Sequence, residues 1–206
     1  MLTSTKEIKI GRISTSEKEI KDITKAWLAI SIAFAIVLAK PIFSSDFYTK
    51  FIVASLTVGI GFLFHEMGHK IAAQRYGCFA EFRSFDNMLL LAIATSFFGI
   101  VLAAPGAVMI SGHVNKKRNG KISAAGPIIN LVLALIFLAI SFMHLPNILK
   151  PVAYYGFVIN SWLALFNMLP FWFFDGYKIL KWNKAVYGAI VAAAVGAMLL
   201  QSFIKL

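Results

Sequence analysis

Residues 51–73 read FIVASLTVGIGFLFHEMGHKIAA, and this stretch carries most of the information about the fold. It is predominantly apolar as far as Phe64 and then changes abruptly to HEMGHK at residues 65–70. An apolar run of about 20 residues can cross the hydrocarbon core of a bilayer as a helix. Because ionisable side chains at that depth are costly, their presence in such a helix predicts a functional site.

The composition of the whole chain indicates a membrane protein. Hydrophobic residues make up 59% of the 206 residues, charged residues 14%, and the mean hydropathy is +0.78. Soluble domains contain about 45–50% apolar and about 25% charged residues. A core of this size could not bury the excess, which must therefore face lipid. This excludes a disordered chain and a free cytosolic protein, and the single cysteine, Cys78, excludes a disulfide-stabilised secreted domain.

The charge balance is strongly basic, with 20 Lys and Arg residues against 9 Asp and Glu and a net charge of +11. In a soluble protein this would suggest a nucleic-acid partner. In a membrane protein it indicates basic cytoplasmic segments that face anionic lipid, so we expect the bilayer and no nucleic acid as a partner. Residues 1–25 are polar and carry six basic residues, which predicts a cytoplasmic N-terminal segment without a signal peptide.

Four further apolar runs are expected to cross the bilayer besides residues 51–73. The predicted fold is an all-α polytopic membrane protein of five to six transmembrane helices with a small membrane-associated β element, and residues 26–206 form its transmembrane domain. The four further runs are residues 26–43, 126–145, 152–174 and 185–204.

Residues 77–125 determine whether five or six helices cross. The positive-inside rule places the basic residues after the second helix, Arg75 among them, and those at 116–121 in the cytoplasm. We therefore expect residues 77–125 to be one cytoplasmic-side excursion, with Lys116, Lys117 and Arg118 in a loop. The apolar run 88–104 would then dip into the membrane and return. The alternative, a sixth helix at 88–104, is compatible with the hydropathy.

Short strands are expected on both sides of this excursion. Backbone at membrane depth needs hydrogen-bond partners, so the excursion must pair with itself or pack against helices. The candidate strands are Phe79–Phe82, which alternate, and Val108–Ile110, which follow the Pro105-Gly106 turn. A weak alternation over residues 8–13 predicts another short strand, and Ser16 is expected to begin a helix.

His65 and His69 form an HExxH motif with Glu66 between them. The i, i+4 spacing places both imidazoles on one helix face, one turn apart, so two ring nitrogens can reach one metal ion. Glu66 lies beside them and can accept a proton from water on the metal. The alternative is a pair of interfacial histidines with a solvated glutamate, which an apolar helix disfavours.

A catalytic zinc usually has three protein ligands, so a third ligand is expected. The acidic residues among the first 46, Glu19 included, are expected to lie away from the helix of His65. The remaining candidates are Glu81, Asp86, His113, His144 and Asp175.

Depth favours Asp175 among these candidates. A helix that rises about 21 Å from the outer face to His65 leaves the metal roughly 9 Å from the inner face of a core about 30 Å thick. Asp175 directly follows the apolar run 152–174. It reaches the depth of the metal if this run also passes from outside to inside, which requires an odd number of crossings between the two helices. The run 126–145 alone meets this condition, whereas a second crossing at 88–104 would not. His144 is expected near the outer end of its helix.

Two further motifs give the chain a resemblance to a known family. Residues 167–176 read NMLPFWFFDG, similar to N-x-x-P-x-x-x-L-D-G with Phe174 in the place of Leu, and Gly126-Pro127-x-x-Asn130 lies between this motif and HExxH. In this order the three motifs resemble those of the site-2 proteases, the intramembrane zinc metalloproteases. The resemblance covers a catalytic core of about residues 51–180, in what looks like a compact member without a PDZ-like insert.

The resemblance implies that His65, His69 and Asp175 hold one Zn²⁺ per chain and that Glu66 is the general base. It also implies that the substrate is a transmembrane helix of another protein, hydrolysed within or near the bilayer. Asn130 and Asn167 are candidates for stabilising the oxyanion or positioning the substrate. The alternative role for these two residues is hydrogen bonding between helices.

The chain is thus expected to be a multi-pass protein of the cell membrane, with a cytoplasmic N-terminus and with water reaching the site from the cytoplasm past a polar face near Lys70. The main alternative is a membrane transporter or metal permease that uses the His pair as an ion site, although such proteins more often show internal repeats. A channel would leave Glu66 without a role. A surface-facing metalloprotease would need an acidic ligand after Asp175, where the sequence has none.

Overall fold

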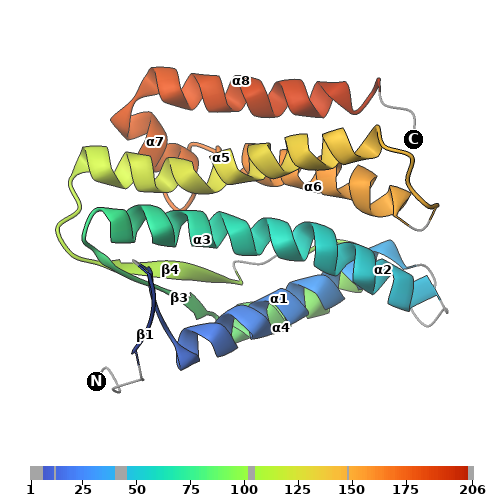
Figure 1. Cartoon of the computed structure of the whole chain (residues 1–206), viewed down its shortest axis with the longest axis horizontal. Coiled ribbons are helices and arrows are strands. Elements are labelled where there is room, and N and C mark those ends of the chain that lie inside the picture. Colours follow the sequence, from blue (N-terminus) through green and yellow to red (C-terminus); the bar gives the residue numbers. More distant parts are fainter. Residues whose placement is uncertain (1–6, 12, 40–45, 102–104, 148, 204–206) are drawn as a thin grey trace.

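The computed structural model describes residues 7–11, 13–39, 46–101, 105–147 and 149–203. Within these ranges the chain is mostly helical, with two small antiparallel sheets. The long helices run along one common axis, and the strands gather at one end of it (Figure 1). The long helices are α1 (Glu17–Leu38), α2 (Asp46–Ala54), α3 (Ile60–Arg75), α5 (Lys116–Ser141), α6 (Lys150–Asn167) and α8 (Lys184–Leu200).

Two helices in the described part of the chain are long and apolar enough to cross a membrane. One runs continuously from Asp46 to Arg75, where a π-helical segment, η1 (Ser55–Gly59), joins α2 to α3. The other is α5, and α8 is a shorter apolar helix. Helix length and apolarity therefore support crossings at two of the predicted runs, 51–73 and 126–145, and leave the other predicted crossings without this support. Residues 116–118 form the first turn of α5, so the expectation that they lie in a loop is wrong.

The helices approach one another through small side chains. Gly59 of η1 faces α1, where an added Cβ would lie 2.6 Å from Trp27 Nε1. The indole N–H of Trp27 donates to the Ser55 carbonyl at 3.2 Å. Small residues at helix contacts are typical of membrane helix bundles, because they let the backbones come close. Fully or nearly fully buried alanines lie at Ala33, Ala54, Ala134, Ala153, Ala164 and Ala194.

The N-terminal segment folds back onto α3. Strands β1 (Glu7–Ile10) and β2 (Ile13–Ser16) pair as a hairpin, where the alternation predicted a single short strand over residues 8–13, and Ser16 caps α1 by accepting the Glu19 N–H at 3.2 Å. The Glu19 carboxylate is buried against Lys70 of α3, with 2.5 Å between Oε2 and Nζ. The expectation that Glu19 lies away from the helix of His65 is therefore wrong, as is the open polar face predicted near Lys70. The contact between Glu19 and Lys70 could not be predicted from the sequence, because it depends on how the β1–β2 hairpin folds back onto α3.

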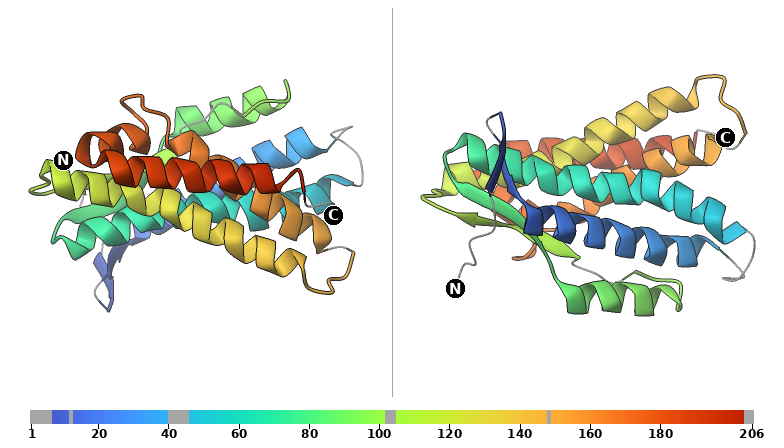
Figure 2. Two further views of the ribbon diagram at one scale, coloured as in Figure 1. Left: turned by 90° about the horizontal axis from the view of Figure 1, so that it is seen from above. Right: turned by 60° about the horizontal axis from the view of Figure 1, so that its bottom comes forward.

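The stretch between Arg75 and α5 leaves the helices and returns to them. Strands β3 (Phe79–Ser84) and β4 (Gly106–Ser111) pair in antiparallel register, which confirms the predicted strands. Between them α4 (Asp86–Ser96) extends alongside α1 (Figure 2). The Phe85 N–H donates to the Pro105 carbonyl at 3.1 Å, so both ends of the intervening stretch meet. This geometry agrees with the predicted excursion, and α4, with 11 residues, is shorter than the helix that a sixth crossing at 88–104 would need.

An ion pair holds α4 against α1. The Lys25 ammonium lies 2.5 Å from Asp86 Oδ1, and this hydrogen bond lowers the pKa of the Asp86 carboxyl. Leu89 and Ala92 of α4 are buried on the same side. The excursion is therefore a packed element rather than a loose loop.

The chain turns sharply after α6. The helix ends at Asn167, before Pro170, where the proline predicted a break. The next helix, α7 (Asp175–Trp182), begins with the aspartate of the DG pair. A Cβ on Gly176 would overlap the Met168 backbone, so glycine permits this close return.

Candidate metal centre

Three buried side chains from two helices converge on one point. His65 Nε2 lies 3.0 Å from His69 Nε2, and Asp175 Oδ2 lies 3.2 Å from the former and 3.0 Å from the latter. Each residue is at most 9% exposed. The structure therefore brings together the three residues predicted as metal ligands, and among the described side chains it groups no other three His, Cys, Asp or Glu in this way.

The local sequence explains how these side chains meet. His65 and His69 are one turn apart on α3, so they share a face. Asp175 is the first residue of α7, which the break after α6 turns back toward α3. The DG pair thus supplies both the carboxylate and the glycine that lets it approach.

Hydrogen bonds from α5 fix the orientation of both imidazoles. His65 Nδ1 lies 2.6 Å from Asn130 Oδ1, and His69 Nδ1 lies 2.8 Å from the Ile122 carbonyl. Both partners are acceptors, so both Nδ1 atoms carry the hydrogen and donate. The Nε2 atoms then present lone pairs toward Asp175, the arrangement found around metal-ligating histidines.

The amide of Asn130 is itself held in one orientation. Its Nδ2 donates to the Gly61 carbonyl at 3.1 Å and to Asn160 Oδ1 at 3.0 Å, which leaves Oδ1 to face His65. Asn160 is in turn fixed because its Nδ2 donates to the Gly156 carbonyl at 2.9 Å. A chain of buried amides therefore runs from α6 through α5 to the histidine.

The donor set fits a zinc ion. Two imidazole nitrogens and a carboxylate oxygen are common zinc ligands, and tetrahedral bonds of 2.0–2.2 Å separate ligand atoms by about 3.3–3.6 Å. The three observed separations, 3.0 to 3.2 Å, lie just below that range. Three lone pairs facing one another in a buried site would repel without a cation between them. Three protein ligands also leave a coordination position free for water or substrate.

Glu66 lies beside this cluster but does not belong to it. Its side chain is buried, and Oε2 accepts the backbone N–H of Val108 at 3.2 Å. The contact brings the edge of β4 directly to the carboxylate. Glu66 and the strand edge therefore form one wall of the same site.

A glycine on α5 allows the close contact between the two helices. A Cβ on Gly126 would lie 2.6 Å from Cε1 and Nε2 of His65 and from Cε1 of His69. No larger residue fits there without displacing the imidazoles or the helix. Gly126, the first residue of the motif Gly126-Pro127-x-x-Asn130, thus lies directly against the metal-binding face.

The cluster opens into a cavity of about 790 Å³. Asn119, Ser123 and Lys178 line it on the side of the basic helix ends, while Phe62, Met88 and Leu163 are among its apolar lining residues. Gly106, Ala107, Val108 and Ile110 of β4 also contribute. The site therefore has polar and apolar approaches and an exposed strand edge.

The other predicted residues take different places. Asn167 lines the cavity, and its Nδ2 donates to the Leu163 carbonyl of its own helix at 2.9 Å. Glu81 pairs with Arg83, and Asp86 pairs with Lys25, so neither joins the cluster. Asn160 and the Val108 N–H were missed by the sequence analysis. Asn160 could have been noticed as an asparagine in an apolar helix. The role of the Val108 N–H could not, because it depends on strand pairing.

Two curated proteins resemble the chain. A Methanocaldococcus jannaschii protein named "Putative zinc metalloprotease MJ0611" is 39% identical over 191 residues, which cover 91% of this chain and 96% of that protein. A second protein of the same organism, "Zinc metalloprotease MJ0392", is 27% identical over 123 residues, 59% of this chain and 31% of the relative. No family model and no solved structure matches the chain.

Proposed function

The chain belongs to a family of zinc metalloproteases, and from this premise we propose that it is an intramembrane zinc endopeptidase of the site-2 type. Its substrates are transmembrane helices of other proteins, cut within or near the bilayer. The observation that carries the proposal is the buried cluster of His65, His69 and Asp175 with Glu66 at its side, packed between two helices that are long and apolar enough to cross a membrane.

The proposed roles follow from the positions of the side chains. His65, His69 and Asp175 hold one zinc ion, which when bound polarises the scissile carbonyl and makes a water molecule more acidic. Glu66 takes the proton of the attacking water and delivers it to the leaving amine. Asn130, whose donors and acceptor are all engaged, orients His65 rather than contacting an oxyanion. Asn167 remains the candidate for contacting substrate, because it lines the cavity.

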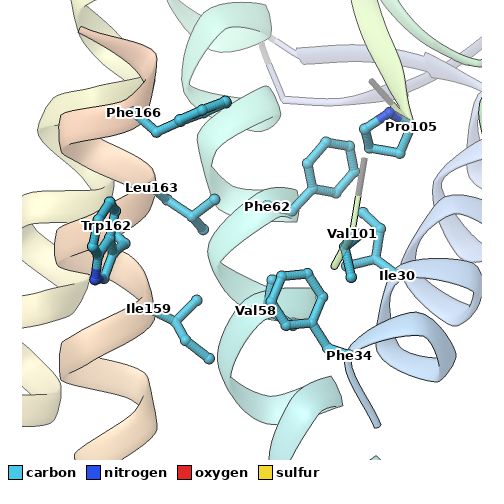
Figure 3. A pocket seen from close by; sticks show the side chains of 10 residues that line it. All are labelled: Ile30, Phe34, Val58, Phe62, Val101, Pro105, Ile159, Trp162, Leu163 and Phe166. Atoms are coloured by element: carbon cyan, nitrogen blue, oxygen red, sulfur yellow. The ribbon is translucent and has the colours of Figure 1, made fainter. Parts of the chain in front are cut away.

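An apolar pocket next to the site supports an apolar substrate. This pocket of about 360 Å³ is lined entirely by apolar side chains and tryptophan. Figure 3 shows Ile159 and Leu163 of α6 across from Val58 of η1 and Phe62 of α3. Phe62, Leu163 and two further lining residues, Pro105 and Phe166, also line the metal cavity. The two spaces therefore adjoin, so an apolar segment can extend from one into the other.

The edge of β4 supports a way to present the substrate. A peptide bond in a helix is shielded by the hydrogen bonds of the helix, so the helix must open before cleavage. In lipid, each backbone group that loses its partner costs roughly several kcal/mol unless it forms a new hydrogen bond. Strand addition supplies such partners. The N–H of Val108 already points into the cavity, where it meets Glu66. A substrate segment paired with β4 would thus lie beside the general base.

The proposed orientation places the strand end of the molecule in the cytoplasm. The first turns of α1, α5 and α8 and the last turn of α3 lie at this end (Figure 1). These turns carry many of the basic residues, as expected for cytoplasmic segments. The N-terminal segment is at the same end, so we place it in the cytoplasm, with five crossings of the cell membrane in total. Water then reaches the metal past Asn119 and Lys178.

Zinc-dependent cleavage tests the proposal directly. The purified chain in detergent should cut a membrane-helix substrate, lose this activity with a chelator and regain it with zinc. Glu66→Gln, nearly isosteric but unable to accept the proton, should keep the zinc and abolish cleavage. The transporter alternative predicts no cleavage by the parent. Cleavage by the Gln variant at the parent's rate, with zinc intact, would remove Glu66 from the mechanism.

A further inference from the structure

A buried ion pair links the N-terminus of α1 to the metal-binding helix. Glu19 is fully buried and Lys70 is 2% exposed, and their charged atoms lie 2.5 Å apart. Lys70 follows His69 directly and lies one turn after Glu66 on α3. Burying two charges is costly and seldom increases stability over an apolar pair, so a retained pair calls for another explanation.

The Glu19 carboxylate does more than neutralise Lys70. Its Oε1 accepts the backbone N–H of Phe82 in β3 at 2.8 Å, and its Oε2 also accepts the Thr15 hydroxyl at 2.7 Å. One carboxylate thus joins α1, α3 and the β3–β4 sheet.

Strand register shows what this bond controls. Phe82 pairs with Val108 directly across the sheet. In an antiparallel pair the two opposite residues point their N–H groups either toward each other's strand or both outward. Here both point outward, Phe82 to Glu19 and Val108 to Glu66. Two glutamates therefore hold the same rung of the sheet from its two edges, and both are tied to α3.

The two edges of the sheet differ in accessibility. On β3, Glu19 occupies the Phe82 N–H, and Gln74 Nε2 donates to the Ala80 carbonyl at 3.0 Å. On β4, residues 106–108 and Ile110 line the metal cavity. Side chains thus occupy the outer edge of β3 away from the metal, whereas the outer edge of β4 lines the metal cavity, and the side chain that meets it there is Glu66.

We infer that Glu19, held by Lys70, is a positioning residue that sets the β4 edge against Glu66 and closes the β3 edge to substrate. The inference rests on the proposed function, because it concerns how a substrate segment is received. Without the Glu19 bond to Phe82 the sheet can move away from α3, and an extended segment then binds less tightly at the metal. The effect should appear in KM, since the metal cluster itself is not altered.

Two double variants of the full chain separate this role from simple folding. Glu19→Leu with Lys70→Met removes both charges and the acceptor for the Phe82 N–H. Glu19→Gln with Lys70→Met removes the same charges but keeps an amide oxygen that accepts this N–H. Neither leaves an unpaired buried charge, so both should fold. Asp46→Asn with Lys50→Met is the control for loss of charge. This partly exposed pair lies at the other end of the continuous helix 46–75 that carries Lys70.

Cleavage of a membrane-helix substrate is compared for zinc-loaded proteins. The Leu/Met variant should retain zinc and raise KM by about tenfold, the effect of losing one charge-assisted hydrogen bond, while kcat changes less. The Gln/Met variant and the control should stay within about twofold of the parent. A merely structural role would instead lower the active fraction, and hence the apparent kcat, with KM unchanged. An unchanged KM in the Leu/Met variant, or an equal rise in both Glu19 variants, would overturn the inference.

Amide hydrogen exchange on the same samples gives a readout that does not need cleavage. Exchange in residues 79–84 and 106–111 should be faster in the Leu/Met variant than in the Gln/Met variant. Equal exchange would overturn the positioning role. Absence of cleavage by the zinc-loaded parent would instead contradict the proposed function, so the two failures are distinguishable.

Discussion

Gly126→Ala tests whether the close contact between α5 and the metal-binding face is needed for metal affinity. The added Cβ would lie 2.6 Å from three imidazole atoms, about 0.8 Å less than the 3.4 Å at which ordinary contact begins. The imidazoles cannot simply retreat, because Asn130 and Ile122 hold both Nδ1 atoms and lie on α5 themselves. If α5 moves instead, these same hydrogen bonds are lost.

The expected magnitude follows from that choice. Loss of the outer hydrogen bonds of metal-binding histidines typically lowers metal affinity by about 10–100-fold. Overpacking should also lower the free energy of unfolding by about 1–3 kcal/mol. Zinc affinity is measured by competition with a chromophoric chelator, and stability by thermal unfolding of the same detergent-solubilised protein.

Gly196→Ala is the matched control for this variant. Gly196 lies inside α8, and an added Cβ there meets nothing within 4 Å. The same chemical change should therefore raise helix stability by about 0.5–1 kcal/mol and leave zinc affinity unaltered. Zinc binding by Gly126→Ala within twofold of the parent would refute the reasoning, because the site would then tolerate a shift of α5.

Three further predictions concern the ligand, its support and the strand edge. Asp175→Ala should lose zinc and activity together, because a ligand is removed; zinc retention equal to that of the parent would exclude Asp175 as a ligand. Asn160→Leu should weaken zinc binding in the same competition assay, since Asn130 loses the acceptor that fixes its amide; unchanged affinity would mean that Gly61 alone orients Asn130. Val108→Pro should slow cleavage of a membrane helix while zinc stays bound, because the edge donor is removed; cleavage at the parent's rate, in a variant that retains zinc, would rule out strand addition at this position.

The parts of the site that depend on local spacing were predictable. The HExxH spacing alone places His65 and His69 on one face, and the structure puts their Nε2 atoms 3.0 Å apart. The distribution of basic residues predicted that residues 88–104 return to the same side of the membrane instead of crossing it. The backbone hydrogen bond from Phe85 N–H to the Pro105 carbonyl agrees with this prediction. Asp175 was identified by its expected depth and by the resemblance of residues 167–176 to a known motif.

The parts that depend on long-range packing were not predictable in the same way. Glu19 lies 51 positions from its partner Lys70, and its place depends on a hairpin that folds back onto α3. The role of Asn160 could not be read from the sequence, because an amide in an apolar helix can form hydrogen bonds between helices without taking part in a site. Only the arrangement of α3, α5 and α6 shows that its amide belongs to the chain that ends on His65.

The closed base of the α4 excursion has a consequence for how the chain can be altered. Because the Phe85–Pro105 bond and the register of β3 with β4 hold the base, the tip beyond α4 bears little on strand alignment. The tip carries Phe98, which is 85% exposed, and Gly99 with a φ of 82°. Doubling the length of a flexible loop costs only about 0.6 kcal/mol. A few added apolar residues can therefore be inserted at this tip, which is expected to lie in the membrane, while the catalytic framework stays in place.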